Sequence, residues 1–294
     1  MSACGLRGRV YSRIQGGAPL CGAVPMERKR KEEVDMTNIL LEKKGYIAVA
    51  TINRPKALNA LNSEVLSDLD ELVATVKADD EIRALVITGS GEKAFVAGAD
   101  IGEMSTLTKE GGTAFGKHGN DVFRVIETLP IPTIAAVNGF ALGGGCELSM
   151  ACDICICADT AVFGQPETGL GITPGFGGTQ RLARLVGPGM AKQLIYTAKN
   201  IKADEAYRIG LVNAVYPLEE LMPAAEKLAE TIAKNAPIAV RACKKAINDG
   251  LQVDMDKAVV IEEKLFGSCF QSADQIEGMS AFLEKRKHEP YQNK

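Results

Sequence analysis

Histidine is scarce in this chain of 294 residues, which contains only His118 and His288. His118 lies in a glycine-rich polar stretch and His288 in a basic tail. Histidine-based catalytic triads and histidine-rich metal sites are therefore poorly supplied. We expect chemistry that uses neither a histidine base nor a bound metal.

Long apolar runs and a strong net charge are also missing. No uninterrupted apolar run is long enough to span a bilayer. The formal net charge is −3, so no basic field favours nucleic acid or an anionic membrane as a partner. The eight cysteines are too dilute for a disulfide scaffold. We expect a cytoplasmic protein with reduced thiols.

The chain divides into three parts by composition. Residues 1–35 have no apolar periodicity and contain a charged run, which indicates a disordered leader or extension outside the fold. Residues 36–187 alternate strand-like and helix-like segments, whereas residues 188–294 read as almost wholly helical. The recurring strand-strand-helix order in the middle part suggests a structural repeat.

Buried strands and amphipathic helices are predicted from apolar spacing. The predicted strands are 39–42, 47–52, 84–88, 133–137 and 154–158. The predicted helices are 63–76, 113–129, 144–152, 179–186, 190–198, 203–209, 218–235, 237–248, 254–266 and 273–287. The segment 89–104 is predicted as a loop. The glycines of the helix 113–129 weaken its helical signal.

Two carboxylates, Glu147 and Glu167, lie in the stretch 138–178 among glycine and apolar residues. A carboxylate in an apolar site is costly unless it finds partners or gains a proton. The glycines 143–145 precede Glu147, and such a run lets a backbone approach a ligand and aim its N–H groups at it. Together these features indicate two acid/base groups beside a backbone anion cradle.

This arrangement suits the addition of water across a double bond conjugated to a thioester. Two carboxylates can share the proton transfers, and two backbone N–H groups can stabilise the enolate oxygen. Gly144, at the start of a predicted helix, can supply one N–H group. The second must come from another segment, and Ala97 in the small-residue loop 97–99 is the best candidate.

Each of these features also has a structural interpretation. Glu147 could be a solvated residue on a helix face, and Glu167 a loop charge. The three glycines could form only a tight strand-to-helix turn. Cys152 and Cys155, with Cys157 nearby, invite a redox or zinc interpretation. Because no second cysteine pair or histidine stands at a ligand spacing, we favour packing on a buried strand.

At these residues the sequence resembles the enoyl-CoA hydratase (crotonase) family. Three patches carry the resemblance, which covers nearly everything from Thr37 to Lys287. They are FVAGADI at 95–101, NGFALGGGCE at 138–147, and FGQPE at 163–167 with LGITPGFGGTQR at 170–181. The resemblance implies an α/β fold, a spiral of repeated ββα units followed by an all-helical C-terminal region that forms trimers. Two trimers usually stack into a hexamer.

The resemblance also implies roles for single residues. Glu147 and Glu167 match the two catalytic glutamates, and Ala97 and Gly144 match the oxyanion-hole amides. The implied substrate-binding residues are Lys56, Ala57, Leu58, Gly98, Ala99, Asp100, Ile101 and Gly175. Asp100 could equally cap a helix. The implied substrate is a short-chain trans-2-enoyl-CoA, with coenzyme A as part of the substrate and no cofactor or metal.

Other activities of the same family remain open. An enoyl-CoA isomerase or acyl-CoA hydrolase would use a similar cradle, but the presence of both glutamates favours hydration. The basic cluster 285–287 is either a solvated helix end or a contact for CoA phosphates. An RNA-binding relative is the alternative outside enzymes, and the net negative charge argues against it.

Overall fold

The computed structural model describes residues 36–294, and the predicted leader 1–35 lies outside the described residues. The strands are β1 (Ile39–Lys44), β2 (Ile47–Ile52), β3 (Ala84–Gly89), β4 (Ala94–Val96), β5 (Thr133–Val137), β6 (Phe140–Leu142), β7 (Ile154–Ala158), β8 (Val162–Gly164), β9 (Ile201–Lys202) and β10 (Ala214–Tyr216). The helices are α1 (Ser63–Ala78), α2 (Ile101–Met104), α3 (Lys109–Glu127), α4 (Gly144–Ala151), α5 (Gly178–Val186), α6 (Pro188–Thr197), α7 (Ala203–Arg208), α8 (Leu218–Ala233), α9 (Pro237–Gly250), α10 (Met255–Cys269) and α11 (Ala273–Leu283). Short 3-10 helices span Pro55–Ala57 (η1) and Pro166–Leu170 (η2).

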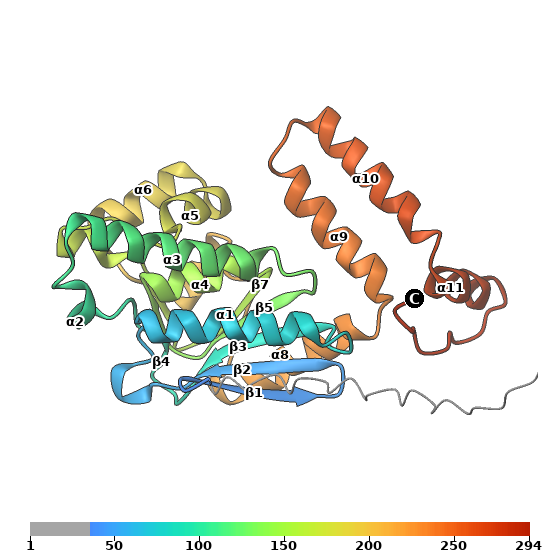
Figure 1. Ribbon diagram of the computed structural model, residues 1–294, viewed down its shortest axis with the longest axis horizontal. Helices are drawn as coiled ribbons and strands as arrows, with labels where there is room; N and C mark the ends of the chain where they lie inside the picture. The colour runs from blue at the N-terminus through green and yellow to red at the C-terminus, as the bar shows by residue number, and fades with distance from the viewer. Residues whose placement is uncertain (1–35) are drawn as a thin grey trace, which may run out of the picture. The chain divides into compact units, whose positions relative to one another are not determined.

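A six-stranded sheet in the order β1-β2-β3-β5-β7-β10 forms the centre of the fold. Only β1 pairs antiparallel, and the other neighbours are parallel. Helix α8 packs across one face, while α1, α3 and α4 enclose the core on the other (Figure 1). The strands β3 and β5 are buried throughout because helices cover both faces, which explains their continuous apolar sequences.

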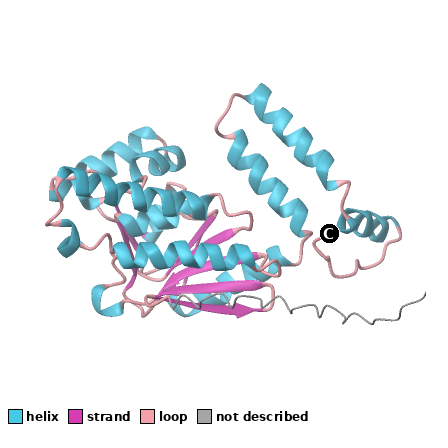
Figure 2. Ribbon diagram, in the orientation of Figure 1, coloured by secondary structure: helices cyan, strands magenta, loops and turns pink. Residues whose placement is uncertain are grey.

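A second sheet, β4-β6-β8-β9, is built from much shorter strands. Each of three successive repeats places its first strand (β3, β5 or β7) in the large sheet and its second (β4, β6 or β8) in the small one. Figure 2 shows these strands beneath the layer of helices. Because β4, β6 and β8 are parallel, their carboxyl ends meet at one edge. The predicted spiral of ββα units is confirmed.

Several predicted elements differ from the structure. The segment 89–104 contains β4 and α2, and β6 and β8 were also not predicted; a three-residue strand leaves too little alternation to detect. Residues 188–294 are almost wholly helical, as predicted; the exceptions are the short strands β9 and β10, of which β10 completes the edge of the large sheet.

The cysteines of β7 pack in the core, as the sequence favoured. Cys155 and Cys157 are buried free thiols, and burial raises the pKa of Cys157 to about 12. In the part of the chain that the structure describes, no group of histidine, cysteine or acidic residues is placed to hold a metal ion. Among residues 36–294 no helix is both long enough and apolar enough to cross a bilayer.

Candidate active site

Three loops that follow β4, β6 and β8 converge on one cavity of about 920 Å³. The loop after β4 contributes residues 97–99, the loop after β6 contributes Gly143 and Gly144, and the loop after β8 contributes Pro166 and Glu167. Glu147, from the first turn of α4, lines the same cavity. The structure thus brings together residues that lie up to 70 positions apart in the sequence, since 167 − 97 = 70.

The glycine run 143–145 is required by close packing as well as by backbone conformation. Gly143 has φ +48°, which favours glycine, and a Cβ there would lie 2.6 Å from Oε1 of Glu167. A Cβ on Gly145 would overlap the carbonyl of Val96 in β4. The glycines therefore seat α4 directly against the small sheet, which points its N-terminus into the cavity. Glycines 143–145 therefore form both a tight strand-to-helix turn and the proposed backbone anion cradle.

Glu147 is only 1% exposed, so the solvated helix-face interpretation is wrong. Its Oε1 accepts hydrogen bonds from the backbone N–H groups of Phe176 at 2.8 Å and Gly178 at 2.6 Å. Gly177, between them, adopts the left-handed conformation with φ +95° that lets both N–H groups face one oxygen. The carboxylate is thus fixed in place by the turn that precedes α5.

Glu167 lies in η2, is 9% exposed, and projects beside Gly143. The side-chain amide of Gln165, oriented with its nitrogen toward the carboxylate, donates to both oxygens of Glu167 at 3.2 and 3.3 Å. Gln165 is itself buried, which restricts how far Glu167 can turn. The second carboxylate is therefore oriented by a neutral donor, and the loop-charge interpretation is wrong.

Burial changes the acidity of both glutamates. Loss of solvent, together with the nearby charge of Glu167, raises the pKa of Glu147 to about 7 against the opposing effect of the two backbone donors. Loss of solvent also raises the pKa of Glu167 to about 7. Two acids with pKa values near neutrality can hold and release a proton between them, which is what acid/base chemistry at physiological pH needs.

A backbone amide in the cavity can bind an anion only if its N–H group does not already donate to an acceptor in the protein. Gly144 is the first residue of α4, and within residues 36–294 its N–H donates to no protein acceptor. The N–H of Ala97 donates to the carbonyl of Leu58 at 3.0 Å, so the predicted role of Ala97 is wrong. Ala99, two residues on, lines the cavity, and among the described residues its N–H has no acceptor. Ala99 replaces Ala97 as the candidate.

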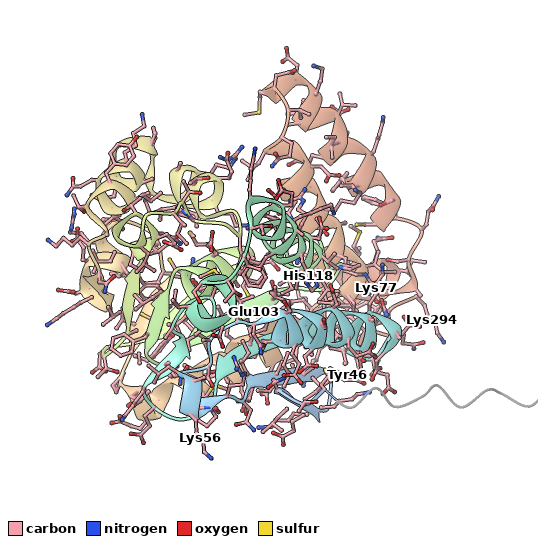
Figure 3. All side chains as sticks on the ribbon, turned by 60° about the vertical axis from the view of Figure 1, so that its left-hand side comes forward. Tyr46, Lys56, Lys77, Glu103, His118 and Lys294 are labelled. Carbon is pink, nitrogen blue, oxygen red and sulfur yellow. The ribbon has the colours of Figure 1, made fainter. Side chains whose placement is uncertain are left out.

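The other predicted substrate-binding residues fall into two groups. Gly98, Ala99, Ile101 and Gly175 line the cavity. The predicted residues Lys56, Ala57, Leu58 and Asp100 do not line it. Lys56 is exposed in η1, at the lower edge of the molecule in Figure 3. Asp100 accepts hydrogen bonds from the N–H groups of Gly102 and Glu103 and lies 3.4 Å from Arg54, so it serves as the cap of α2.

Sequence reasoning missed the residues that hold the site in shape. Gln165 orients Glu167, and Asn120 of α3 donates to the carbonyl of Gly175 at 2.7 Å. Phe176 packs against Phe115 and Phe123, with ring centroids 5.3 and 5.5 Å apart, and so fixes the turn that binds Glu147. The sequence GFGG at 175–178 was the available signal for these residues, because a glycine-rich turn shortly after Glu167 indicates a backbone that must approach another group closely.

The raised pKa values of Glu147 and Glu167 predict a stability that falls as pH rises. Between the ordinary glutamate pKa of 4.5 and the folded value of about 7, the folded chain binds more protons than the unfolded chain. We therefore expect the free energy of unfolding to fall across this window. Replacing both glutamates by glutamine should remove the fall and stabilise the protein at pH 8 by about 2 kcal/mol or more.

Urea unfolding at pH 5 and pH 8 measures this effect. Glu110→Gln, at an exposed position of α3, is the matched control and should keep the pH dependence of the parent chain. An unchanged slope in the double variant would show that the two carboxyls titrate alike in the folded and unfolded states.

Comparison with known proteins agrees with this geometry. Residues 42–293 match the family model described as enoyl-CoA hydratase/isomerase. The chain is 58% identical to the short-chain-enoyl-CoA hydratase of Clostridium acetobutylicum, over 89% of this chain and 100% of that protein. It is 59% identical to the crotonyl-CoA hydratase of Syntrophomonas wolfei, over 85% of this chain and 96% of that protein.

Solved structures show the same fold. An enoyl-CoA hydratase from Bacillus anthracis superimposes with a TM-score of 0.85 at 41% identity, over 87% of this chain and 100% of that chain. The strand order, the glycine-seated helix and the paired glutamates described above therefore occur in a chain that belongs to the enoyl-CoA hydratase/isomerase family.

Proposed function

We propose that this chain is an enoyl-CoA hydratase that adds water reversibly to short-chain trans-2-enoyl-CoA, such as crotonyl-CoA, to give 3-hydroxyacyl-CoA. The observation that carries the proposal is the pair of buried carboxylates, Glu147 and Glu167, in one cavity with two backbone N–H groups that have no acceptor among residues 36–294. Two relatives of more than half identical sequence bear the names short-chain-enoyl-CoA hydratase and crotonyl-CoA hydratase, which supports the same activity.

The proposed mechanism uses each part of the cavity once. The N–H groups of Gly144 and Ala99 bind the thioester oxygen and stabilise the negative charge that it gains in the enolate. One carboxylate of the pair accepts a proton from water as the oxygen bonds to the β-carbon. A carboxyl of the pair delivers a proton to the α-carbon. Because the two acids titrate as a pair, the proton belongs to both.

The remaining cavity residues position the substrate in this proposal. Gly98, Ile101 and Gly175 lie beside the reacting groups and contact the thioester and its chain. Both carboxylates lie on one side of the substrate, so water and proton add to the same face. The product regains its neutral thioester, and the carboxylate pair returns to its starting protonation.

An absorbance assay tests the proposal directly. Adding the full chain to crotonyl-CoA should remove the absorbance of the conjugated enoyl thioester. The product distinguishes the enzymes of this fold: 3-hydroxybutyryl-CoA supports a hydratase, a shifted alkene indicates an isomerase, and free CoA indicates a hydrolase. No change in absorbance, with retention of RNA on a filter, would favour an RNA-binding relative.

We expect the reaction to need no metal or redox cofactor, because the thioester, the two acids and the backbone N–H groups account for every proton and charge. Full activity after dialysis against EDTA is the expected result. We also expect the enzyme to act in the cytoplasm, in fatty acid or butyrate metabolism, with metabolite levels setting the direction of the reaction.

We further propose that the chain assembles as a trimer or a hexamer of two trimers. Helix α10 packs on α9, and the C-terminal helices leave large apolar side chains exposed, among them Met255 at 75% and Phe282 at 82%. Exposed apolar surface of this kind favours association. Sedimentation of the full chain at micromolar concentration tests this assembly, and a stable monomer would contradict it.

A further inference from the structure

The side chain of Arg181, in the first turns of α5, packs behind the turn that binds Glu147. It is only 12% exposed. Its Nη1 donates to the backbone carbonyl of Phe176 at 2.8 Å, and a Cβ on Gly177 would overlap the same nitrogen. The backbone N–H of Phe176 in turn donates to Oε1 of Glu147 at 2.8 Å. A single residue of the turn therefore links the guanidinium to the carboxyl of the active site.

Glu127 of α3 holds Arg181 from the opposite side. Oε2 of Glu127 lies 3.0 Å from Nη2 of Arg181 and 2.9 Å from Nη1 of Arg124. Burial raises the pKa of Glu127, but the hydrogen bonds and charges of the two arginines outweigh that effect and hold it below its ordinary value. Glu127 is therefore ionised at neutral pH and restricts the position of the Arg181 side chain.

Stability alone is a poor reason for this buried ion pair. Well-packed apolar side chains of similar volume often stabilise a protein as well as a buried ion pair or better. The Nε of Arg181 is also buried, and it has no hydrogen-bond partner within residues 36–294, which costs free energy. The place of Arg181 beside the turn at 176–178 offers a functional reason instead.

The charges around Glu147 show what Arg181 contributes. The charged or titratable side chains near it include Cys146 of α4, Glu167 of η2, Lys109 and Lys117 of α3, and Arg181 of α5. Burial and the charge of Glu167 raise the pKa of Glu147, whereas the backbone donors and Arg181 oppose the rise. Burial raises the pKa of Cys146 to about 12, so that thiol is neutral. Both lysines are exposed, and solvent screens them. Arg181 is therefore the buried positive charge of this set.

We propose that Arg181 is a positioning residue for the proton transfers: held by Glu127, it fixes the turn 176–178 against Glu147 and supplies the positive charge that offsets the two carboxylates. The proposal rests on the hydratase activity proposed above and adds a residue to its site. Arg181 does not line the cavity, so it acts through Glu147 and not on the substrate.

The pH dependence of kcat/KM for crotonyl-CoA, measured with the full chain, tests the proposal. Arg181→Met removes the charge and both hydrogen bonds. Because the glutamate pair then holds its protons to higher pH, both limbs of the profile should move up by about one pH unit. At the optimum, kcat should fall by about tenfold, while KM changes by less than about threefold. Arg181→Lys keeps the charge and should return both limbs to the parent positions.

Two further variants separate the charge of Arg181 from its packing. Glu127→Gln removes the negative charge that partly neutralises Arg181, so both limbs should move down, opposite to the shift in Arg181→Met. Arg184→Met is the matched control, because Arg184 is exposed on the same helix and donates to Gln180. It should keep the parent profile. A purely structural role for Arg181 would lower the activity without moving the limbs in opposite directions.

Parent limbs in Arg181→Met would overturn the proposal, whatever the loss of kcat. If Arg181→Met does not fold, Glu127→Gln decides, and limbs that stay in place or move up would overturn it. A parent chain that hydrates no enoyl thioester would instead refute the proposed function. Arg181 is then tested by urea unfolding, in which Arg181→Met should extend the fall in the free energy of unfolding to about pH 8. An unchanged window would overturn the proposed role.

Discussion

Glu147→Gln and Glu167→Gln should each lower kcat for crotonyl-CoA hydration by about 10²- to 10⁴-fold. Glutamine keeps the shape of the side chain, and its carbonyl oxygen can still accept the hydrogen bonds from Phe176 and Gly178 that hold residue 147. What it loses is the ability to exchange a proton. The variants should therefore fold, bind the thioester with little change in affinity, and fail in the proton transfers.

Steady-state rates measure the loss of proton transfer, and the binding of a saturated acyl-CoA measures the affinity for the thioester separately. Glu103→Gln is not a suitable control, because the carboxylate of Glu103 accepts a hydrogen bond from the backbone N–H of Ser63 in the first turn of α1. The exposed Glu110 of α3 is suitable, and Glu110→Gln should keep full activity. Near-normal turnover in either active-site variant would remove that carboxyl from the mechanism.

Gly144→Pro should lower kcat by about 10²- to 10³-fold, because it removes one of the two N–H groups proposed to bind the enolate oxygen. Proline suits the first position of a helix, where its missing N–H group breaks no helical hydrogen bond. Gly144 occupies that position in α4, and its N–H has no acceptor within the described residues. The substitution therefore removes the oxyanion donor and leaves the helix ladder intact.

Gly144→Ala is the matched control for this variant. It adds the same Cβ, which lies 3.2 Å from Leu61 Cδ1 and 3.2 Å from Phe176 Cδ2, but it keeps the N–H group. Proline also adds Cγ and Cδ, and its Cδ takes the place of the N–H hydrogen, so the difference between the two kcat values reports the lost donor together with that added group. Equal activity in the two variants would show that the Gly144 amide does not stabilise the transition state.

The long elements of the fold were predictable because their patterns are local. A continuous apolar run predicts strand β5, and apolar residues at helical spacing predict helix α1. The small sheet was missed because β6 and β8 are three residues each, and their partners come from other repeats. The two glutamates were found because a carboxylate among glycines and apolar residues is unusual in any fold.

The error at Ala97 has a different physical origin. Whether a backbone N–H group is free depends on which carbonyl lies opposite, and the acceptor here is Leu58, which is 39 residues earlier in the chain, since 97 − 58 = 39. Leu58 and Asn59 both adopt positive φ, which is common for asparagine but rare for leucine. No local pattern shows that this loop turns its carbonyl toward Ala97, so the choice between Ala97 and Ala99 needed coordinates.

The place of α8 has a consequence for synthesis of the chain on the ribosome. The apolar side chains on one face of the large sheet, such as Ile47, Val86 and Ile134, are covered by Leu221, Ala225 and Ala229 of α8. Those strands emerge well before residue 218, so the nascent chain carries an uncovered apolar face until about the last quarter is translated. The fold is therefore completed late, and a chain released near residue 187 exposes a surface prone to aggregation.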